Sequence, residues 1–280
     1  MRPDSLLVIG LGPVGGSLAW AAVRSGVPRV VGFSSERRDA VQAVSAGAVH
    51  EIADRLESAA RAADFVVVAA PAGGTEVLGR FSPYLTSGAF VTSVVDLALP
   101  AASAATAAGL ASRWAASHPL RVAASLGFAA ARPELFHGAV VYVAPAADEG
   151  DGAAREVMHF WSDVIGAEPV RIAPDAHDDT LGWMEQLPRL LAASVAAAYG
   201  AHGFGAISWG SDARAMTDLA LVDPGHLADT LIANRRAVEG ALAATTGALD
   251  ALASAIADGD QGRLTTLLED ARRVRQGSHR

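Results

Sequence analysis

The sequence predicts a doubly wound α/β domain followed by an all-helical domain, and three features carry this prediction. The first half alternates short, apolar, β-branched runs with amphipathic stretches. A glycine-rich stretch, VIGLGPVGGS at residues 8–17, directly follows the first of these runs. After Ala176 long helical periods replace the strand-like runs. The expected domains are therefore residues 1–173 and 174–280.

The expected strands are apolar runs without polar alternation, a pattern typical of a parallel sheet covered on both faces. In chain order they are SLLVIG, RVVGF, FVVVAAP, AFVTSVV, VAASLG, VVYVAP and EPVRIAP. The alanine-rich stretch 101–116 is expected to be a helix packed on this sheet. In the second half, Asp223 and Pro224 form a helix start, and this helix is expected to run to about Asp258, with Asp260 capping another.

The predicted C-terminal helices carry more apolar side chains than one isolated helix can cover. These side chains include Leu227, Leu231, Val238, Leu242 and Leu249. We therefore expect a homodimer that forms through these helices.

Composition excludes several classes of function. The formal net charge of -8 argues against nucleic acid and anionic membranes as partners. The chain has no cysteine, and all 22 basic residues are arginine, so thiolate metal sites and lysine catalysis are excluded. Apolar runs such as FVVVAAPA are shorter than a membrane span, and no signal peptide is visible. We expect a cytoplasmic protein that acts on a small-molecule substrate.

The glycine-rich stretch matches the pattern G-x-G-x-x-G at Gly10, Gly12 and Gly15. Between a strand and a helix, these glycines allow a tight turn, close approach of a pyrophosphate and tight packing of the helix on the strand. The pattern predicts a dinucleotide site, the alternative being a purely structural turn. The predicted contacts are Gly10, Gly12, Pro13, Val14 and Gly15, with Ala70 and Pro71 after the run FVVVA.

The residues after the second expected strand indicate which dinucleotide is bound. NAD enzymes usually place Asp or Glu there, whereas this chain has Ser34 and Ser35 followed by Arg37 and Arg38. Hydroxyl and guanidinium groups suit a 2′-phosphate, so we expect NADP in preference to NAD. The alternative is that the arginines form only a solvated helix start.

Five segments, GLGPVGGSLA, AAPAGGTEVL, SHPL, ARPELFHGA and DPGHLADTLIANRRAV, resemble the prephenate/arogenate dehydrogenase family over nearly the whole chain. The resemblance implies a Rossmann-type doubly wound parallel sheet followed by an all-α dimerisation domain. It also implies oxidative decarboxylation of a cyclohexadienol, in which a base removes the C4 hydroxyl proton while hydride passes to nicotinamide. His118 stands at the family's catalytic histidine, and imidazole titrates near neutral pH.

The sequence departs from the family close to this histidine. The family continues His-Pro-Met-Ala-Gly-Ser, whereas this chain reads HPLRVA, which introduces Arg121. A family segment Asp-x-Gly-Ser-x-Lys is here SVVDLA, which places Asp96 at the serine position. Within reach of His118, Asp96 would orient the ring and stabilise the imidazolium form. The alternative is that Asp96 caps the helix expected after Leu99 and Pro100.

A further departure concerns the arginine that binds the substrate's ring carboxylate in the family. The equivalent stretch TDLALVDP has Asp218 at that position, and the family's Ser-His-Leu-Pro-His is here EQLPR, with Glu185 and Arg189 at its ends. Either the positive charge has moved to Arg121, Arg189 or Arg214, or the substrate has changed. We favour a changed, amine-bearing or less acidic substrate in specialised metabolism, because the three exchanges at Asp96, Glu185 and Asp218 are all acidic.

Two other functions fit the same two-domain layout. One is a reductase that uses NADPH to reduce an imine or ketone, and the other is a non-catalytic homologue that only binds a nucleotide. Retention of His118 argues against the second, because a binding protein needs no titratable group there. A metal site at His177, Asp178, Asp179 and Glu185 is not expected, because no second histidine is clustered with them. A capped helix start explains those residues better.

Overall fold

The computed structural model describes residues 2–70, 75–120, 127–146, 151–205 and 209–277. Its contacts divide the chain into two compact units, Met1–Asp178 and Asp179–Arg280. Pro71, Arg121 and all but the last residue of the expected strand VAASLG lie outside the described residues.

The first unit is built around one eight-stranded sheet with the strand order β3-β2-β1-β4-β5-β6-β7-β8. All neighbouring strands pair in parallel except β6 and β7, which are antiparallel. The strands are β1 (Ser5–Ile9), β2 (Arg29–Phe33), β3 (Glu51–Ile52), β4 (Phe65–Val68), β5 (Phe90–Val94), β6 (Trp114–Pro119), β7 (Val140–Pro145) and β8 (Glu168–Arg171). The doubly wound α/β fold is confirmed, with a sheet that is parallel in the main.

Strand β6 was not among the predicted strands, although it carries His118. Its sequence, WAASHP, is rich in alanine and serine, which have little intrinsic preference for strands. It forms because β5 and β7 offer backbone partners on both sides, as the registers Ser93↔Ala116 and Ala116↔Ala144 describe. The short β3 was also missed, for lack of any apolar run.

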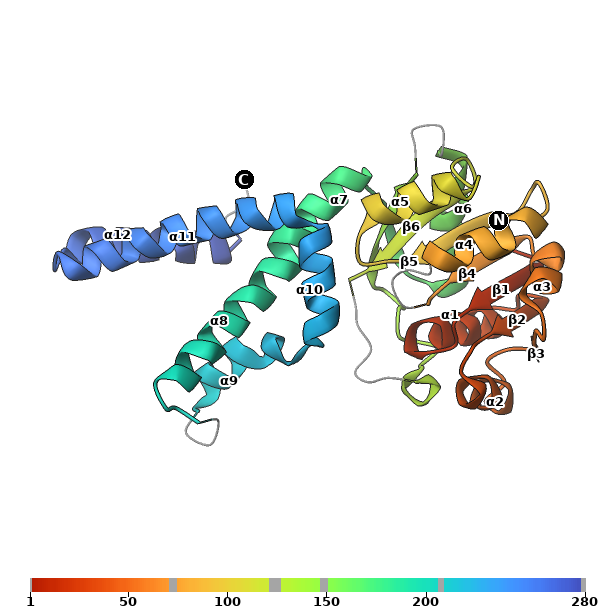
Figure 1. Ribbon diagram of the computed structural model, residues 1–280, viewed down its shortest axis with the longest axis horizontal. Helices are drawn as coiled ribbons and strands as arrows, with labels where there is room; N and C mark the ends of the chain where they lie inside the picture. The colour runs from red at the N-terminus through yellow and green to blue at the C-terminus, as the bar shows by residue number, and fades with distance from the viewer. Residues whose placement is uncertain (1, 71–74, 121–126, 147–150, 206–208, 278–280) are drawn as a thin grey trace. The chain divides into compact units, whose positions relative to one another are not determined.

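Helices cover both faces of the sheet (Figure 1). Helices α1, α2 and α6 contribute to the apolar core on one face, and α3, α4 and α5 to the core on the other. In β1, Leu6 and Val8 face the first core, and Leu7 and Ile9 face the second. This double coverage explains the continuous apolar runs. The helices are α1 (Pro13–Arg24), α2 (Arg37–Ser45), α3 (Leu56–Ala62), α4 (Thr75–Phe81), α5 (Ala98–Ala107) and α6 (Asp151–His159).

The doubly wound order reverses at β1, because the chain runs from β1 to β2 and β3 on one side and to β4, β5 and β6 on the other. In open α/β sheets, ligands bind beyond the carboxyl ends of the strands at this reversal. The glycine-rich stretch, the residues after β4 and β5, and His118 near the end of β6 all lie at this edge of the sheet.

The second unit is helical, as expected. Helix α7 (Pro174–Leu181) leads into it, and a π-helical turn, η6 (Gly182–Gln186), follows. The remaining helices are α8 (Leu187–Ala201), α9 (Ser211–Thr217), the short 3-10 segment η8 (Asp218–Leu221), α10 (Pro224–Ala233), α11 (Arg235–Ala257) and α12 (Gln261–Arg275).

The prediction of one continuous helix from Asp223 to Asp258 is wrong, because the helix is interrupted at Asn234, between α10 and α11. The buried Asn234 amide donates to the Gln186 side-chain oxygen at 2.7 Å. The predicted caps are confirmed: the Asp223 and Asp260 carboxylates accept the backbone N–H groups of His226 and Arg263.

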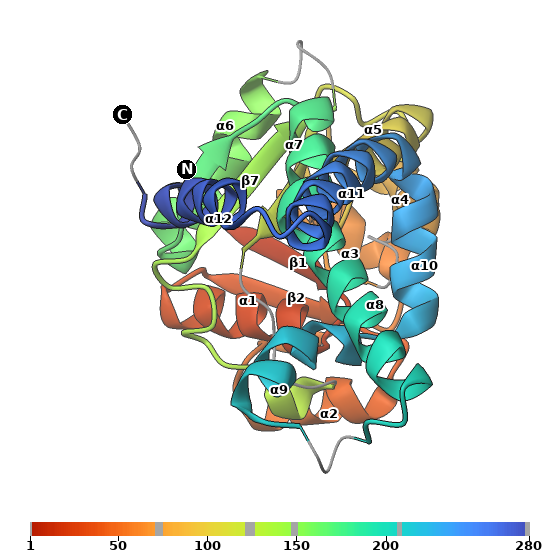
Figure 2. The same cartoon turned by 90° about the vertical axis from the view of Figure 1, so that its left-hand side faces the viewer.

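Helix α11 is 23 residues long and exposes much of its apolar surface, with α12 packed alongside it (Figure 2). Leu249 is 55% exposed and Ile256 is 66% exposed. By length and composition α11 could cross a membrane: its most apolar 18-residue window has a mean hydropathy of 1.3 and is 11% buried. The sequence shows no long apolar run here, because polar residues are interspersed among the apolar residues of this helix.

Candidate functional site

The three glycines of the pattern have different surroundings in the loop between β1 and α1. Gly10 has a φ of +92°, and a Cβ there would lie 2.4 Å from the Ala69 carbonyl oxygen. A Cβ on Gly15 would lie 1.9 Å from the Gly10 carbonyl oxygen. A Cβ on Gly12 would meet nothing within 4 Å among the residues that the structure describes. Gly10 and Gly15 are thus required by the fold, whereas Gly12 leaves open space in front of the helix.

This loop fits the pyrophosphate of a dinucleotide. Gly12 is the N-cap of α1, Pro13 occupies the first turn, and that turn contains no acidic residue. The N-terminus of a twelve-residue helix attracts anions through its free N–H groups and its dipole. Val14 and Ala70 are half-buried beside the loop. The open side of Gly12 therefore suits close approach of a phosphate to the backbone.

The turn after β2 carries the residues predicted to select the cofactor. Ser34 is half-buried and its hydroxyl accepts the Glu36 backbone N–H at 3.1 Å. Ser35 is exposed, and so are Arg37 and Arg38, which begin α2. The position directly after β2, where a ribose-binding carboxylate would stand, is a serine.

His118 lies near the carboxyl end of β6 and is 7% exposed. Its Nδ1 lies 2.9 Å from the backbone carbonyl oxygen of Val95, which follows β5. A carbonyl oxygen can only accept, so Nδ1 carries the hydrogen of the neutral ring. Nε2 is then the nitrogen that can take up a proton. The fold thereby fixes both the orientation of the ring and the role of each nitrogen.

A buried polar network lies beneath this histidine, and sequence reasoning missed it. The Ser117 hydroxyl accepts the Trp161 indole N–H at 2.7 Å and shares a second 2.7 Å contact with the Thr92 hydroxyl. All three side chains are buried. Such satisfied networks hold neighbouring strands in one arrangement, so this one supports the position of His118.

The N-terminus of α5 shows that one alternative for Asp96 is wrong. The helix starts at Ala98 and its N-cap residue, Leu97, provides no side-chain cap. The Asp178 carboxylate instead accepts the backbone N–H groups of Ala98 at 2.7 Å and Leu99 at 3.0 Å. Asp96 is exposed after β5, and an orienting role toward His118 stays a prediction. No local pattern could reveal a cap supplied from 80 residues away.

Asp178 and His177 lie within α7 rather than at a helix start. The His177 ring is 1% exposed, and its Nδ1 lies 2.7 Å from Asp178 Oδ1. Its ring centroid lies 5.2 Å from that of His118 and 6.0 Å from that of Tyr142. Within the described part of the chain, no cluster of three or more His, Asp or Glu residues could hold a metal ion.

The predicted substrate residues of the second unit form one ion pair. Glu185 and Arg189 lie one helical turn apart with 3.0 Å between Oε2 and Nη2, and each side chain is 27% exposed. Arg214 donates from Nε to the Trp209 carbonyl oxygen at 3.1 Å. Asp218 is exposed at the start of η8. The pair of Glu185 and Arg189 thus balances its own charge, whereas Asp218 is an exposed carboxylate.

Comparison with known families identifies the chain. The model of the prephenate dehydrogenase nucleotide-binding domain matches residues 18–170, and that of the prephenate dehydrogenase dimerization domain matches residues 173–270. The chain belongs to the prephenate dehydrogenase family. The first match begins downstream of Gly15, so the interpretation of the glycine loop depends on its own geometry.

A curated relative agrees with the assignment to this family. Prephenate dehydrogenase from Bacillus subtilis (strain 168) is 27% identical over 206 residues, which cover 69% of this chain and 53% of the relative. The chain thus spans about half the length of that curated relative.

Solved structures of the family share the fold. Synechocystis arogenate dehydrogenase has a TM-score of 0.85 at 23% identity, over 97% of this chain and 99% of that one. Prephenate dehydrogenase from Aquifex aeolicus has a TM-score of 0.88 at 21% identity, over 99% of both chains. The Aquifex enzyme in complex with hydroxyphenyl propionate and NAD+ gives 0.88 at 22% identity, over 97% of both. The Rossmann-type domain followed by a helical domain is therefore the fold of this family.

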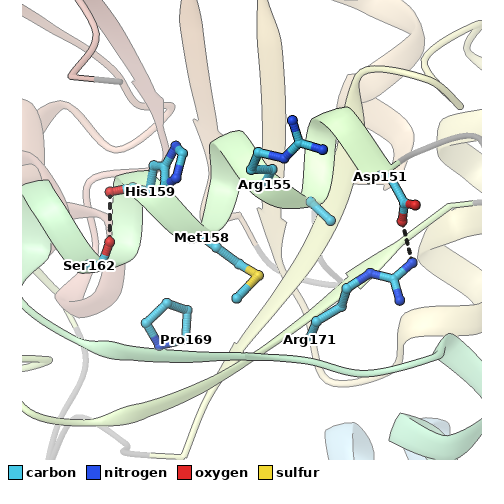
Figure 3. A pocket seen from close by; sticks show the side chains of 8 residues that line it. Asp151, Arg155, Met158, His159, Ser162, Pro169 and Arg171 are labelled. Carbon is cyan, nitrogen blue, oxygen red and sulfur yellow. Dashed lines mark hydrogen bonds and ion pairs between the residues drawn. The ribbon is translucent and has the colours of Figure 1, made fainter.

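The family member also has a pocket that sequence reasoning did not single out. It has a volume of about 460 Å³ and lies between α6 and β8 (Figure 3). Arg155, Met158 and His159 line it from α6, and Pro169 and Arg171 from β8. Arg171 forms an ion pair with Asp151 at its rim. None of the predicted site residues that the structure describes lines it.

Proposed function

We propose that this protein is an NADP-dependent dehydrogenase that oxidises a cyclohexadienyl substrate, with His118 as the base. The observation that carries the proposal is the fixed orientation of the His118 ring, whose Nδ1 donates to the Val95 carbonyl oxygen. This ring lies at the same edge of the sheet as Gly12, where a phosphate can approach the backbone. The dehydrogenases among the relatives support the class of reaction.

His118 performs the proton transfer in this proposal. A bound nicotinamide dinucleotide supplies the acceptor for hydride. His118 Nε2 takes the proton of the substrate hydroxyl, or of the amine that replaces it, as the C–H bond at the same carbon breaks. The resulting imidazolium keeps its Nδ1–H directed at Val95, and this hydrogen bond becomes charge-assisted and stronger. Burial of the ring excludes most of the water that would compete for the proton.

NADP is the proposed cofactor because of the turn after β2. A serine there lacks the charge that would repel a 2′-phosphate, and the exposed Arg37 and Arg38 supply two guanidinium groups within five residues of the strand. The structure of the Aquifex relative contains NAD+, so the catalytic efficiency of this protein should be measured with both NADP and NAD. A catalytic efficiency with NAD equal to or above that with NADP refutes this preference.

The proposed substrate bears an amine or is less acidic than prephenate. The ion pair between Glu185 and Arg189 presents no net charge, so Asp218 carries this part of the proposal. Asp218 stands where the family resemblance places a carboxylate-binding arginine, and a second carboxylate there would repel an acidic ring substituent. An ammonium or a neutral hydrogen-bond donor is the matching group.

The experiment is to follow reduced nicotinamide with NADP or NAD and each of prephenate, arogenate and 4-amino-4-deoxyprephenate. Turnover of 4-amino-4-deoxyprephenate above prephenate and arogenate supports the proposal. Preferred turnover of prephenate or arogenate refutes the changed substrate. No turnover of any of the three, together with tight binding of NADPH, refutes the cyclohexadienyl substrate and indicates a reductase or dehydrogenase with another substrate. In the matched variant His118→Asn, we expect turnover to be lost while the affinity for NADPH stays unchanged. An effect on affinity alone favours a non-catalytic nucleotide-binding homologue.

We also propose that α11 pairs with a second copy of the chain rather than with a membrane. The match to a dimerization domain over residues 173–270 supports this, and the exposed Leu242 and Leu249 lie within it. Light scattering of the purified protein tests it. A dimer that Leu249→Asp dissociates supports the proposal, and a monomer, or a protein that requires detergent, refutes it.

A further inference from the structure

The pair formed by His177 and Asp178 is buried and has an assigned hydrogen position. Asp178 is 4% exposed, and its two carboxylate oxygens accept the backbone N–H groups of Ala98 and Leu99. A carboxylate engaged in this way acts as an acceptor, so the hydrogen in the 2.7 Å contact with His177 belongs to the histidine Nδ1. The Nε2 of the neutral ring is then an acceptor with a lone pair.

This Nε2 has no hydrogen-bond partner among the described residues and is fully buried. Buried polar atoms in native proteins nearly always have partners, and the exceptions concentrate where a water or a ligand completes the site. The surroundings point to such a site. The rings of His118 and Tyr142 both make edge-to-face contacts with the His177 ring, and His118 pairs with Tyr142 across β6 and β7.

We propose that His177 is a positioning residue of the His118 site. Its Nε2 accepts a hydrogen bond from an O–H donor bound beside His118, either a water molecule or the substrate hydroxyl, and so fixes that group relative to the base. This inference rests on the proposed function, because it assigns a partner within the same site. Asp178 has two roles in it: it keeps the His177 hydrogen on Nδ1 and caps α5, which follows the strand that orients His118.

Nitrogen-15 NMR of histidine-labelled protein tests the hydrogen position without catalysis. In the free wild-type protein, we expect His177 to show a protonated Nδ1 and an unprotonated Nε2. With NADP and 3-(4-hydroxyphenyl)propionate added, the Nε2 signal moves upfield if a ligand hydroxyl is the donor. An Nε2 that is already hydrogen-bonded in the free protein, and stays so, identifies water. A protonated Nε2, or an Nε2 without a hydrogen-bond shift in both states, overturns the proposal.

Two variants separate positioning from packing. His177→Phe keeps a ring against His118 and Tyr142 but removes the acceptor. Asp178→Asn keeps the His177 ring but replaces the carboxylate that accepts from its Nδ1 by an uncharged amide. We expect each to lower kcat by about tenfold or more, with the affinity for NADPH unchanged. His159→Phe, on α6, is the control and keeps full activity. Unchanged kcat in a folded His177→Phe protein overturns the proposal. If the wild type oxidises no substrate offered, the proposed function fails, and the NMR result alone decides the role of His177.

Discussion

Replacement of Gly12 by alanine separates cofactor binding from folding at the glycine loop. Gly12 has a φ of -67°, which any residue adopts, and its added Cβ would meet no atom of the described residues within 4 Å. Loss of a glycine from an N-cap costs a few tenths to about 1 kcal/mol, and the smaller entropy of the unfolded alanine chain offsets about 0.4–1 kcal/mol. We therefore expect the free energy of unfolding to change by less than about 1 kcal/mol.

The affinity for the dinucleotide should change far more. The methyl group enters the open space that the proposed pyrophosphate uses, so phosphate and helix N-terminus must separate. Loss of one or two charge-assisted hydrogen bonds to backbone N–H groups costs about 1.5–3 kcal/mol each, which corresponds to at least a tenfold weaker Kd. Gly15→Ala is the contrasting variant. Its Cβ would lie 1.9 Å from a carbonyl oxygen, and we expect a loss of about 3 kcal/mol in stability.

The assay combines titration of NADPH fluorescence with chemical denaturation of the same samples. Gly88→Ala is the control, because its Cβ also meets nothing within 4 Å in the described part of the chain, and Gly88 lies away from the strand ends that form the site. Full affinity for NADPH in Gly12→Ala would refute our assignment of the loop to the cofactor. A large loss of stability in that variant would refute the open space at Gly12.

Three further predictions concern the supports of the site. Asp178→Ala removes the acceptor of two backbone N–H groups and of His177, so we expect the free energy of unfolding to fall by about 3 kcal/mol, measured by urea denaturation; a loss below 1 kcal/mol contradicts the cap. Ser117→Ala leaves the buried Trp161 indole N–H without its acceptor and should cost about 2 kcal/mol, with Ser103→Ala on exposed α5 surface as the control. Equal losses in the two would contradict the role of the network. Arg38→Ala should raise the KM for NADP by about threefold to tenfold and leave that for NAD unchanged; parallel changes in steady-state kinetics with both cofactors would contradict a contact with the 2′-phosphate.

The sequence alone predicted the class of fold and the place of the cofactor loop. Runs such as LLVI in β1 are apolar at every position because helices cover both sheet faces, and this double coverage is visible in the sequence as a missing alternation. The glycine spacing and the caps at Asp223 and Asp260 are local signals, since each depends on residues within a few positions.

Only the tertiary structure decided how the histidine site is built. Strand β6 has little strand preference of its own and forms because its neighbours pair with it. The cap of α5 comes from Asp178, the partner of His118 is the backbone of Val95, and Asn234 interrupts a helical pattern because it bonds to Gln186. Each of these contacts joins residues at least 23 positions apart. Local periodicity reports which face of an element is buried, but which polar groups meet there depends on how the elements pack.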